Sequence, residues 1–423
     1  MHISRAMKKH FLLAFVLSLA TTPVFAQEAQ FVDVVRMLRH PDPDERLRSV
    51  KMLREAGYVE AVEPIAPLVA DPVDDVQLAA IEAVLSLLMV DDGTRTRLGF
   101  LTSRPKSLGL TAFEAGPGAM KAVSLPPAVV DHLLTALNDE NDRVRFEAIH
   151  ALGALAQPPL TIPQTRKIVA GLDHYDATMR AATARVIARL KVRDAEDALI
   201  AATRDSNQAV RQFAMYALGE LESEKAIPAL TQQVEHYRSN TQATFALLAL
   251  AKIASPSSAD LFRQYLAAKD PGHRAASAEG LGRVGADDFV PQLEQRLQNE
   301  RGPAVQLAYF FALQKLGRDY LEHIAAALAD DDTAAQATEY LIELGPPVAK
   351  GLAPYLASQE DNVRGRVAQI LGVIGGADVV PVLESARMDG NPAVAAAVAA
   401  AIARITAREK APGPGLRAPG LSN

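Results

Sequence analysis

The residues of this chain that could support chemistry are histidines and acidic residues, because the 423-residue sequence contains no cysteine. Nine histidines are present, and they fall in different segments: His2, His10, His40, His132, His150, His174, His236, His273 and His323. Imidazole and carboxylate groups together can hold a metal ion such as zinc. Asp173, His174 and Asp176 could hold a metal in principle. The alternative is a helix-capping turn that carries a surface imidazole, and the sequence favours it.

The acidic turns could in principle bind a cation, and residues 71–75 and 330–332 are the best candidates. Neither cluster forms the D-x-[DN]-x-[DN]-G loop with a distal Glu that calcium-binding loops use. Short acidic side chains also accept hydrogen bonds from the unpaired amides at a helix start, and they favour the positive end of its dipole. We therefore expect these residues to cap helices.

Motifs for catalysis are absent from the sequence. It has no G-x-S-x-G nucleophile turn, no G-x-x-x-x-G-K-[ST] phosphate loop and no H-E-x-x-H metal motif. The expectation is a non-enzymatic protein with no catalytic residue, no cofactor and no metal centre.

A recurring motif organises the sequence around these residues. It consists of Val210-Arg211 followed by Ala214, Ala217-Leu218-Gly219 and Leu221. Residues that match Arg211 recur about every thirty-one positions, at 46, 77, 145, 180, 211, about 242, 274, 306, 334, 364 and 395. The longest interval, between 77 and 145, contains an insertion. Such a period predicts a solenoid of stacked repeats.

Each repeat has the pattern of an A helix, an acidic turn and a B helix. From residue 195 to 221 the apolar residues follow a helical period, which breaks at Asp205-Ser206-Asn207 and resumes at Val210. Glycines such as Gly285 fit a left-handed helix stop or a close helix crossing. We expect an all-α fold, a right-handed α-α superhelix of about eleven helical hairpins that spans residues 27–410.

The segment from Val210 to Leu230 closely resembles HEAT repeats in its Val-Arg, Ala-Leu-Gly and Pro-x-Leu elements. It is similar in particular to the short bacterial HEAT-like repeats that are also found in the phycobilisome lyase family. The resemblance covers residues 31–408 and implies an armadillo-like helical solenoid whose B helices line the concave side. The motif arginine is replaced at four places: Gln77, Gln306, Ala334 and Ala395. We expect any arginine–aspartate ladder along the array to be interrupted there.

A stripe of B-helix residues two, five and nine positions after the motif arginine is expected to face the concave groove. Tyr216 and Phe311 are aromatic in this mostly polar stripe, so they are candidate anchors for a protein or peptide partner. The charged candidates for partner binding are Arg185, Arg189, Glu220, Glu279, Arg283 and Lys315. Two alternatives remain open: Phe311 packs on a neighbouring repeat, and the charged residues form a solvated face.

The insertion at about residues 90–125 is rich in glycine and carries more basic than acidic residues. Its candidate contact residues are Arg95, Arg97, Phe100, Arg104 and Phe113. Long loops on a rigid scaffold are commonly functional. The insertion is therefore either a flap or second contact, which could suit an acidic partner, or a tolerated surface decoration.

The first 26 residues have the pattern of a secretory signal peptide. Basic residues precede an apolar run from Phe11 to Ala20, and Val24-Phe25-Ala26 supplies small residues at the cleavage site. The run is too short to span a bilayer, so we expect cleavage and no transmembrane segment afterwards. Residues 411–423 are rich in proline and glycine and are predicted to be disordered. These features predict an exported protein, periplasmic or secreted.

The formal net charge of −6 argues against a general nucleic-acid binder. We expect a non-enzymatic exported scaffold or adaptor that binds a protein or peptide partner along the concave face. One alternative is an envelope-associated structural protein that recognises a cell-wall or outer-membrane component. Another is a lyase-like or chromophore-handling accessory factor, which the family resemblance implies.

Overall fold

A computed structural model describes residues 31–89, 107–115, 125–238 and 240–410 of the chain. These residues form two compact units, unit 1 up to Ala195 and unit 2 from Glu196 onward. The regular elements in these ranges are all α-helices or short 3₁₀-helices (η), which confirms the predicted all-α fold. Several predictions lie outside the described residues: the signal peptide at 1–26, the tail at 411–423, and the insertion residues Arg95, Arg97, Phe100 and Arg104.

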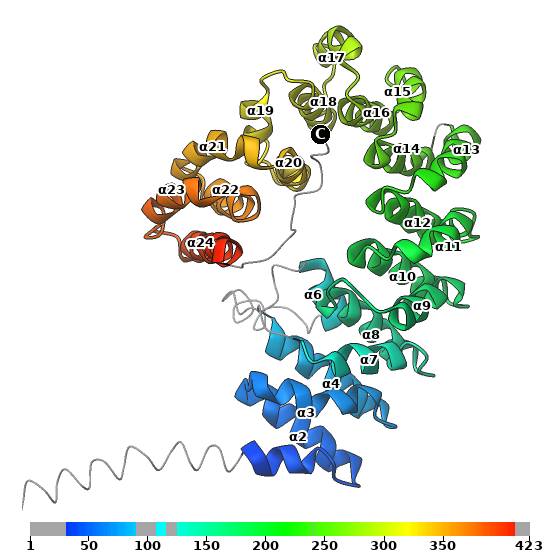
Figure 1. The fold of residues 1–423 in the computed structure, drawn as a ribbon, viewed down its shortest axis with the longest axis vertical. Coiled ribbons are helices and arrows are strands. Elements are labelled where there is room, and N and C mark those ends of the chain that lie inside the picture. Colours follow the sequence, from blue (N-terminus) through cyan, green and yellow to red (C-terminus); the bar gives the residue numbers. More distant parts are fainter. Residues whose placement is uncertain (1–30, 90–106, 116–124, 239, 411–423) are drawn as a thin grey trace, which may run out of the picture. The chain divides into compact units, whose positions relative to one another are not determined.

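Unit 1 is a stack of helical hairpins with one additional helix, α6 (Leu108–Ala115) (Figure 1). Its B helices are α2 (Pro43–Ala56), α4 (Asp74–Leu88), α8 (Asp142–Leu155) and α10 (Ala177–Leu190). The A-side elements are η1 (Val59–Ala61), α3 (Val62–Ile65), η2 (Ala66–Ala70), α7 (Pro127–Ala136), α9 (Ile162–Ala170), η4 (Gly171–Asp173) and η5 (Arg193–Ala195). Helix α4 contacts both α2 and α8, and α8 contacts α10, so the B helices pack side by side in chain order.

Unit 2 repeats the same arrangement (Figure 1). Its B helices are α12 (Gln208–Glu220), α14 (Thr241–Ile253), α16 (Pro271–Val284), α18 (Pro303–Lys315), α20 (Asp331–Leu344), α22 (Asp361–Ile374) and α24 (Pro392–Lys410). The A-side elements are α11 (Glu196–Ala202), η6 (Glu224–Ala226), α13 (Ile227–Tyr237), η7 (Pro256–Ser258), α15 (Ala259–Tyr265), η8 (Asp287–Phe289), α17 (Val290–Leu297), α19 (Leu321–Ala326), η9 (Pro346–Val348), α21 (Ala349–Leu352), η10 (Ala353–Ala357), η11 (Ala377–Val379) and α23 (Val380–Ser385). Each B helix contacts the next one from α12 to α24.

The described residues thus contain eleven B helices, as the repeat count predicted. The motif arginine, or the residue that replaces it, is the fourth residue of its B helix in every hairpin except that of α14. In α14 the predicted position, Gln242, is the second residue. The sequence period therefore gave the helix register in all but one repeat.

The motif arginine has a structural task that explains its recurrence. Arg274 donates from Nη1 to the carbonyl oxygens of Ala268 and Lys269, at 3.0 and 2.9 Å, in the turn before its own helix. Its Nε and Nη2 then bind both carboxylate oxygens of Glu300 in the following repeat, at 2.6 and 2.9 Å. The same two-point ion pair joins Arg46 to Asp71 and Arg364 to Asp389. One side chain thus closes a turn and ties two hairpins together.

The expected interruption of this ladder at glutamine is only partial. Gln77 donates from Nε2 to Oδ2 of Asp139, at 2.9 Å, and so preserves the link to the next repeat. Gln306 preserves the turn contact, because its Nε2 donates to the carbonyl oxygen of Glu300 at 3.0 Å. The neutral amide can replace either half of the arginine contact, because it also carries N–H donors.

An acidic or asparagine turn residue caps most of the B helices, as expected. The side chains of Asp42, Asn141, Asp176, Asn207, Asn240, Asp270 and Asp330 accept amide hydrogens at the first turns of α2, α8, α10, α12, α14, α16 and α20. Asp71 differs, since its carboxylate receives Arg46 and the amide of Val73. No group of three or more His, Cys, Asp or Glu side chains in the described ranges could hold a metal ion.

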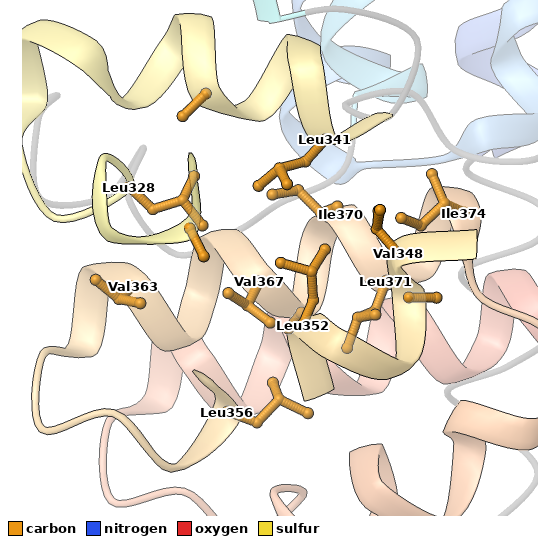
Figure 2. Close-up of a cluster of buried hydrophobic side chains, with 14 of the residues drawn as sticks. Leu328, Leu341, Val348, Leu352, Leu356, Val363, Val367, Ile370, Leu371 and Ile374 are labelled. Atoms are coloured by element: carbon orange, nitrogen blue, oxygen red, sulfur yellow. The ribbon is translucent and has the colours of Figure 1, made fainter. Parts of the chain in front are cut away.

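In unit 2, apolar residues of several successive hairpins form a buried cluster between A and B helices. Leu341 of α20, Leu352 of α21 and Leu371 of α22 are buried in this cluster (Figure 2). Close B-helix crossings complete the packing, because a Cβ on Gly282 would lie 2.6 Å from the Cα of Ala312 in the next B helix. Gly285 ends α16 with a φ of 72°, as the left-handed stop predicted. No helix in the described ranges is long and apolar enough to cross a membrane.

Candidate functional site

The inner face of unit 1 is the side of the B helices turned away from their A helices, and it carries His150, Gly153, Arg185 and Arg189. The insertion helix α6 lies on this face, in contact with α8 and α4. The ring of Phe113 is almost fully buried there. A Cβ on Gly153 would lie 2.6 Å from that ring, so only glycine leaves room for it. The ring of His150 meets Phe113 edge to face, with centroids 5.6 Å apart.

Two predicted partner-binding arginines hold α6 in this position. The guanidinium groups of Arg185 and Arg189 lie 5.0 and 4.4 Å from the centroid of the Phe113 ring. Arg189 donates from Nη2 to the carbonyl oxygen of Phe113 at 3.0 Å, near the carboxyl end of α6. Arg185 pairs with Glu114, with Nη2 and Oε1 3.3 Å apart. Both arginines therefore contact a segment of their own chain, which corrects the expectation that they face an open groove.

The amino end of α6 is anchored as well. The amide of Gly109 donates to Oε2 of Glu147 at 2.8 Å, and this carboxylate of α8 is buried. A carboxylate at the amino end and a guanidinium at the carboxyl end both suit the helix dipole. Sequence reasoning missed Glu147. Nothing in the repeat pattern distinguishes Glu147 from other residues of its position in the repeat, because its contact partner belongs to the inserted helix α6.

His150 is buried beneath α6. Its Nδ1 lies 2.8 Å from the carbonyl oxygen of Phe146, one turn earlier in α8. Burial is the main cause that lowers the pKa of His150, and the positive charge of Arg185 acts in the same direction. The lowered pKa favours the neutral imidazole, and protonation would place a cation under Phe113 near Arg185.

The inner face of unit 2 carries Tyr216, Glu220, Lys252, Glu279, Arg283, Lys315, Glu339 and Glu343. Arg283 is its centre. Its Nε and Nη2 bind Oε1 and Oε2 of Glu343 at 2.8 and 2.9 Å, and its Nη1 binds Oε2 of Glu279 at 2.7 Å. Burial alone would raise the pKa of Glu343, but its hydrogen bonds and attraction to Arg283 lower it overall.

Phe311 belongs to this buried centre. Its side chain is fully buried and stacks on Tyr340, with ring centroids 4.2 Å apart and an interplanar angle of 18°. The guanidinium of Arg283 lies 4.9 Å from the Phe311 centroid, and the Tyr340 hydroxyl donates to Oε1 of Glu279 at 2.7 Å. Phe311, Glu279 and Arg283 are therefore part of the packed interior. For Phe311 this agrees with the alternative that it packs on a neighbouring repeat, and it corrects the prediction of Glu279 and Arg283 as surface contacts for a partner.

The rim of this face remains accessible. Lys252 lies 3.9 Å from Glu220 and 3.6 Å from Glu343, and Lys315 lies 4.0 Å from Glu343. Burial raises the pKa of Glu339, and the negative charges of Glu220 and Glu279 raise it further against the opposing effect of Lys252. Sequence reasoning missed Lys252, because the motif register is shifted in α14.

Tyr216 is the exposed aromatic residue of the inner face of unit 2, with 49% of its surface accessible. It lies one turn before Glu220 on α12 and so shares a helix face with this rim. Of the predicted partner-binding residues in unit 2, the structure leaves Tyr216, Glu220 and Lys315 at the surface. This arrangement of an aromatic side chain beside fixed charges can bind a polypeptide. It brings together no metal ligand set within the described ranges.

Comparison with known proteins identifies the repeat. Family models of HEAT repeats match residues 129–157, 165–247 and 240–314. A search of curated proteins found no match. The solved complex of CpcE and CpcF of phycocyanin lyase from Nostoc sp. PCC7120 is 24% identical, covers 59% of this chain and 96% of that chain, and has a TM-score of 0.40. Kap121p is 14% identical over 89% of this chain and 45% of its own, with a TM-score of 0.38. Importin beta is 15% identical over 88% and 54%, with a TM-score of 0.40. We conclude that this chain contains HEAT repeats over residues 129–157 and 165–314.

Proposed function

We propose that this protein is a non-enzymatic scaffold or adaptor that is exported and binds a protein or peptide partner on the inner faces of its B helices. The amino-terminal signal pattern supports export to the periplasm or the medium. In unit 2 the contact surface is the accessible rim of the inner face, with Tyr216 as its aromatic anchor.

The single observation that carries the proposal is the half-exposed ring of Tyr216, which lies one turn before the charged Glu220 on α12. Exposed aromatic side chains surrounded by polar groups are typical centres of binding energy. The neighbouring charges are already ordered by ion pairs, since Lys252 lies within 4 Å of both Glu220 and Glu343. A partner that binds here would order few additional side chains, which favours affinity.

The test is capture of a partner from cell-envelope extracts by the purified full chain, followed by a binding measurement with the purified partner. We expect Tyr216→Ala to weaken binding at least about tenfold. Met388→Ala is the matched control, because Met388 is apolar, lies in the same unit and is 92% exposed, but stands in the turn before α24. Equal binding by the wild type and Tyr216→Ala would reject this site.

Export has its own test. Fractionation of cells that express the full chain should place the protein outside the cytoplasm and shortened by the 26 signal residues. A full-length protein that stays in the cytoplasmic fraction would contradict the proposed location. Capture of a cell-wall polysaccharide in place of a polypeptide would favour the envelope-associated alternative.

A further inference from the structure

We propose that the inner face of unit 1 is a recognition groove for a short helix, and that α6 occupies it in cis as a pseudo-ligand that a partner helix displaces. The partner helix would present small residues, an aromatic ring and then a carboxylate, in the spacing of Gly109, Ala112, Phe113 and Glu114. This inference rests on the proposed scaffold function and names the partner chemistry for one of its surfaces.

Each feature of α6 has a complementary group in the groove. Ala112 is fully buried and Phe113 nearly so, and Gly153 provides the space for the ring. Arg185 receives the carboxylate of Glu114 and lies beside the ring. These groups bind a small, an aromatic and an acidic side chain in that order. A separate polypeptide can also carry this pattern.

The two ends of the groove select a helix rather than an extended strand. Glu147 accepts the amide of Gly109 at the start of α6, and Arg189 donates to the carbonyl of Phe113 near its end. Amides that point out at one end and carbonyls that point out at the other are the unpaired groups of a helix. Any short helix that runs in the same direction offers them.

The groove does not depend on α6 for its construction. Helix α8 packs directly on α4, α10 and its own A helix α7. The floor of the groove is therefore held by contacts within and between hairpins. Removing α6 would expose Gly153 and the two arginines, but would leave these helix contacts in place.

The occupant is held weakly enough to exchange. Helix α6 has eight residues, and helices of that length are marginal without tertiary contacts. Its other apolar residues, Leu108 and Leu110, are only partly buried. The attachment thus depends on the side chains of Ala112 and Phe113, the Arg185–Glu114 ion pair and two hydrogen bonds to the backbone of α6, which a partner helix could replace one for one.

The test uses the full chain and a labelled synthetic peptide with the sequence of residues 107–115, blocked at both ends. We expect Phe113→Ala, which removes the cis anchor, to bind this peptide at least about tenfold more tightly than the wild type. A peptide with alanine in place of its phenylalanine should not bind. The double variant Phe113→Ala with Gly153→Val, whose groove is filled, should not bind the intact peptide either.

Hydrogen exchange on the wild type provides a second measurement that does not depend on a variant. The amides of α6 should exchange much faster than those of α8, because α6 opens without unfolding the hairpins. The proposal is overturned if a helical, folded Phe113→Ala variant binds the peptide no better than the wild type. Protection of α6 equal to that of α8 would also overturn it. Neither result bears on Tyr216 in unit 2, so failure here is distinguishable from failure of the scaffold function.

Discussion

The guanidinium of Arg283 and the carboxylate of Glu343 form a two-point ion pair across 60 residues, with Nε–Oε1 and Nη2–Oε2 distances of 2.8 and 2.9 Å. Arg283 is on α16 and Glu343 is on α20, two B helices apart. Because α18 lies between them in the stack, the pair spans three consecutive hairpins on the inner face of unit 2. The side chains of Arg283 and Glu343 therefore pair with each other across the inner face of unit 2.

Replacement of Arg283 should therefore destabilise unit 2. Arg283→Ala leaves the carboxylates of Glu279 and Glu343 without their main counter-charge, and the arginine side chain is only 5% exposed. Loss of one partner from a buried ion pair typically costs about 3 kcal/mol or more. Urea unfolding followed by far-UV circular dichroism should show a lower transition midpoint for unit 2.

Lys315→Ala is the matched control for this prediction. Lys315 reaches the same carboxylate of Glu343, but at 4.0 Å and from a side chain about a third exposed. Surface pairs of this kind contribute less than about 1 kcal/mol. A similar decrease in the urea midpoint for Arg283→Ala and Lys315→Ala would show that the buried Arg283 ion pairs contribute no more to stability than the exposed Lys315 pair.

Alanine variants of Phe311 and Tyr216 should distinguish a residue needed for stability from one needed for partner binding. Phe311→Ala creates a cavity against Tyr340 and should lower the free energy of unfolding by about 4 kcal/mol. Tyr216→Ala removes a half-exposed ring and should change the free energy of unfolding by less than about 1 kcal/mol, while it weakens partner binding. A large thermal destabilisation by Tyr216→Ala would mean that its ring has a packing role.

The motif arginine can be tested at Arg274. Arg274→Ala removes two contacts to turn carbonyls and the ion pair with Glu300, so we expect a loss of about 2 kcal/mol. Arg274→Gln should lose only about half as much, because Gln306 shows that an amide can reach the turn carbonyl. If thermal unfolding shows the same decrease in stability for Arg274→Ala and Arg274→Gln, the turn contact and the ion pair do not contribute separately as proposed.

The sequence predicted the parts of this fold that repeat. The motif arginine, the capping residue Asn207 and the left-handed stop at Gly285 each have one local structural task, so their spacing was enough to place the helices. The resemblance to HEAT repeats rested on these same residues, and the family matches bear it out.

The candidate site was less predictable, because it depends on contacts between residues far apart in the chain. Phe311 occupies the same motif column as Tyr216, yet one is buried and the other half-exposed. The difference arises because Arg283 and Tyr340 cover the ring of Phe311. Likewise, Arg189 binds the carbonyl of Phe113, 76 residues earlier, inside an insertion that has no repeat pattern.

The buried imidazole of His150 should make unit 1 sensitive to acid. Burial lowers its pKa in the folded state below the ordinary value of about 6.5. Below about pH 6.5 the unfolded chain therefore binds more protons at His150 than the folded chain does. The contribution of the neutral imidazole to the stability of unit 1 is fully present above about pH 6.5 and is lost as the pH falls. Arg185 increases the cost of protonation, and Glu114 offsets part of it.

Thermal unfolding of the wild type and His150→Leu at pH 7.5 and pH 5.0 tests this effect. The wild type should lose more stability than the variant between the two pH values, because leucine fills the site under Phe113 without a titrating group. His236→Leu is the control, since His236 is exposed on α13, and it should keep the wild-type response. If His150→Leu shows the same acid sensitivity as the wild type, groups other than the His150 imidazole cause that sensitivity.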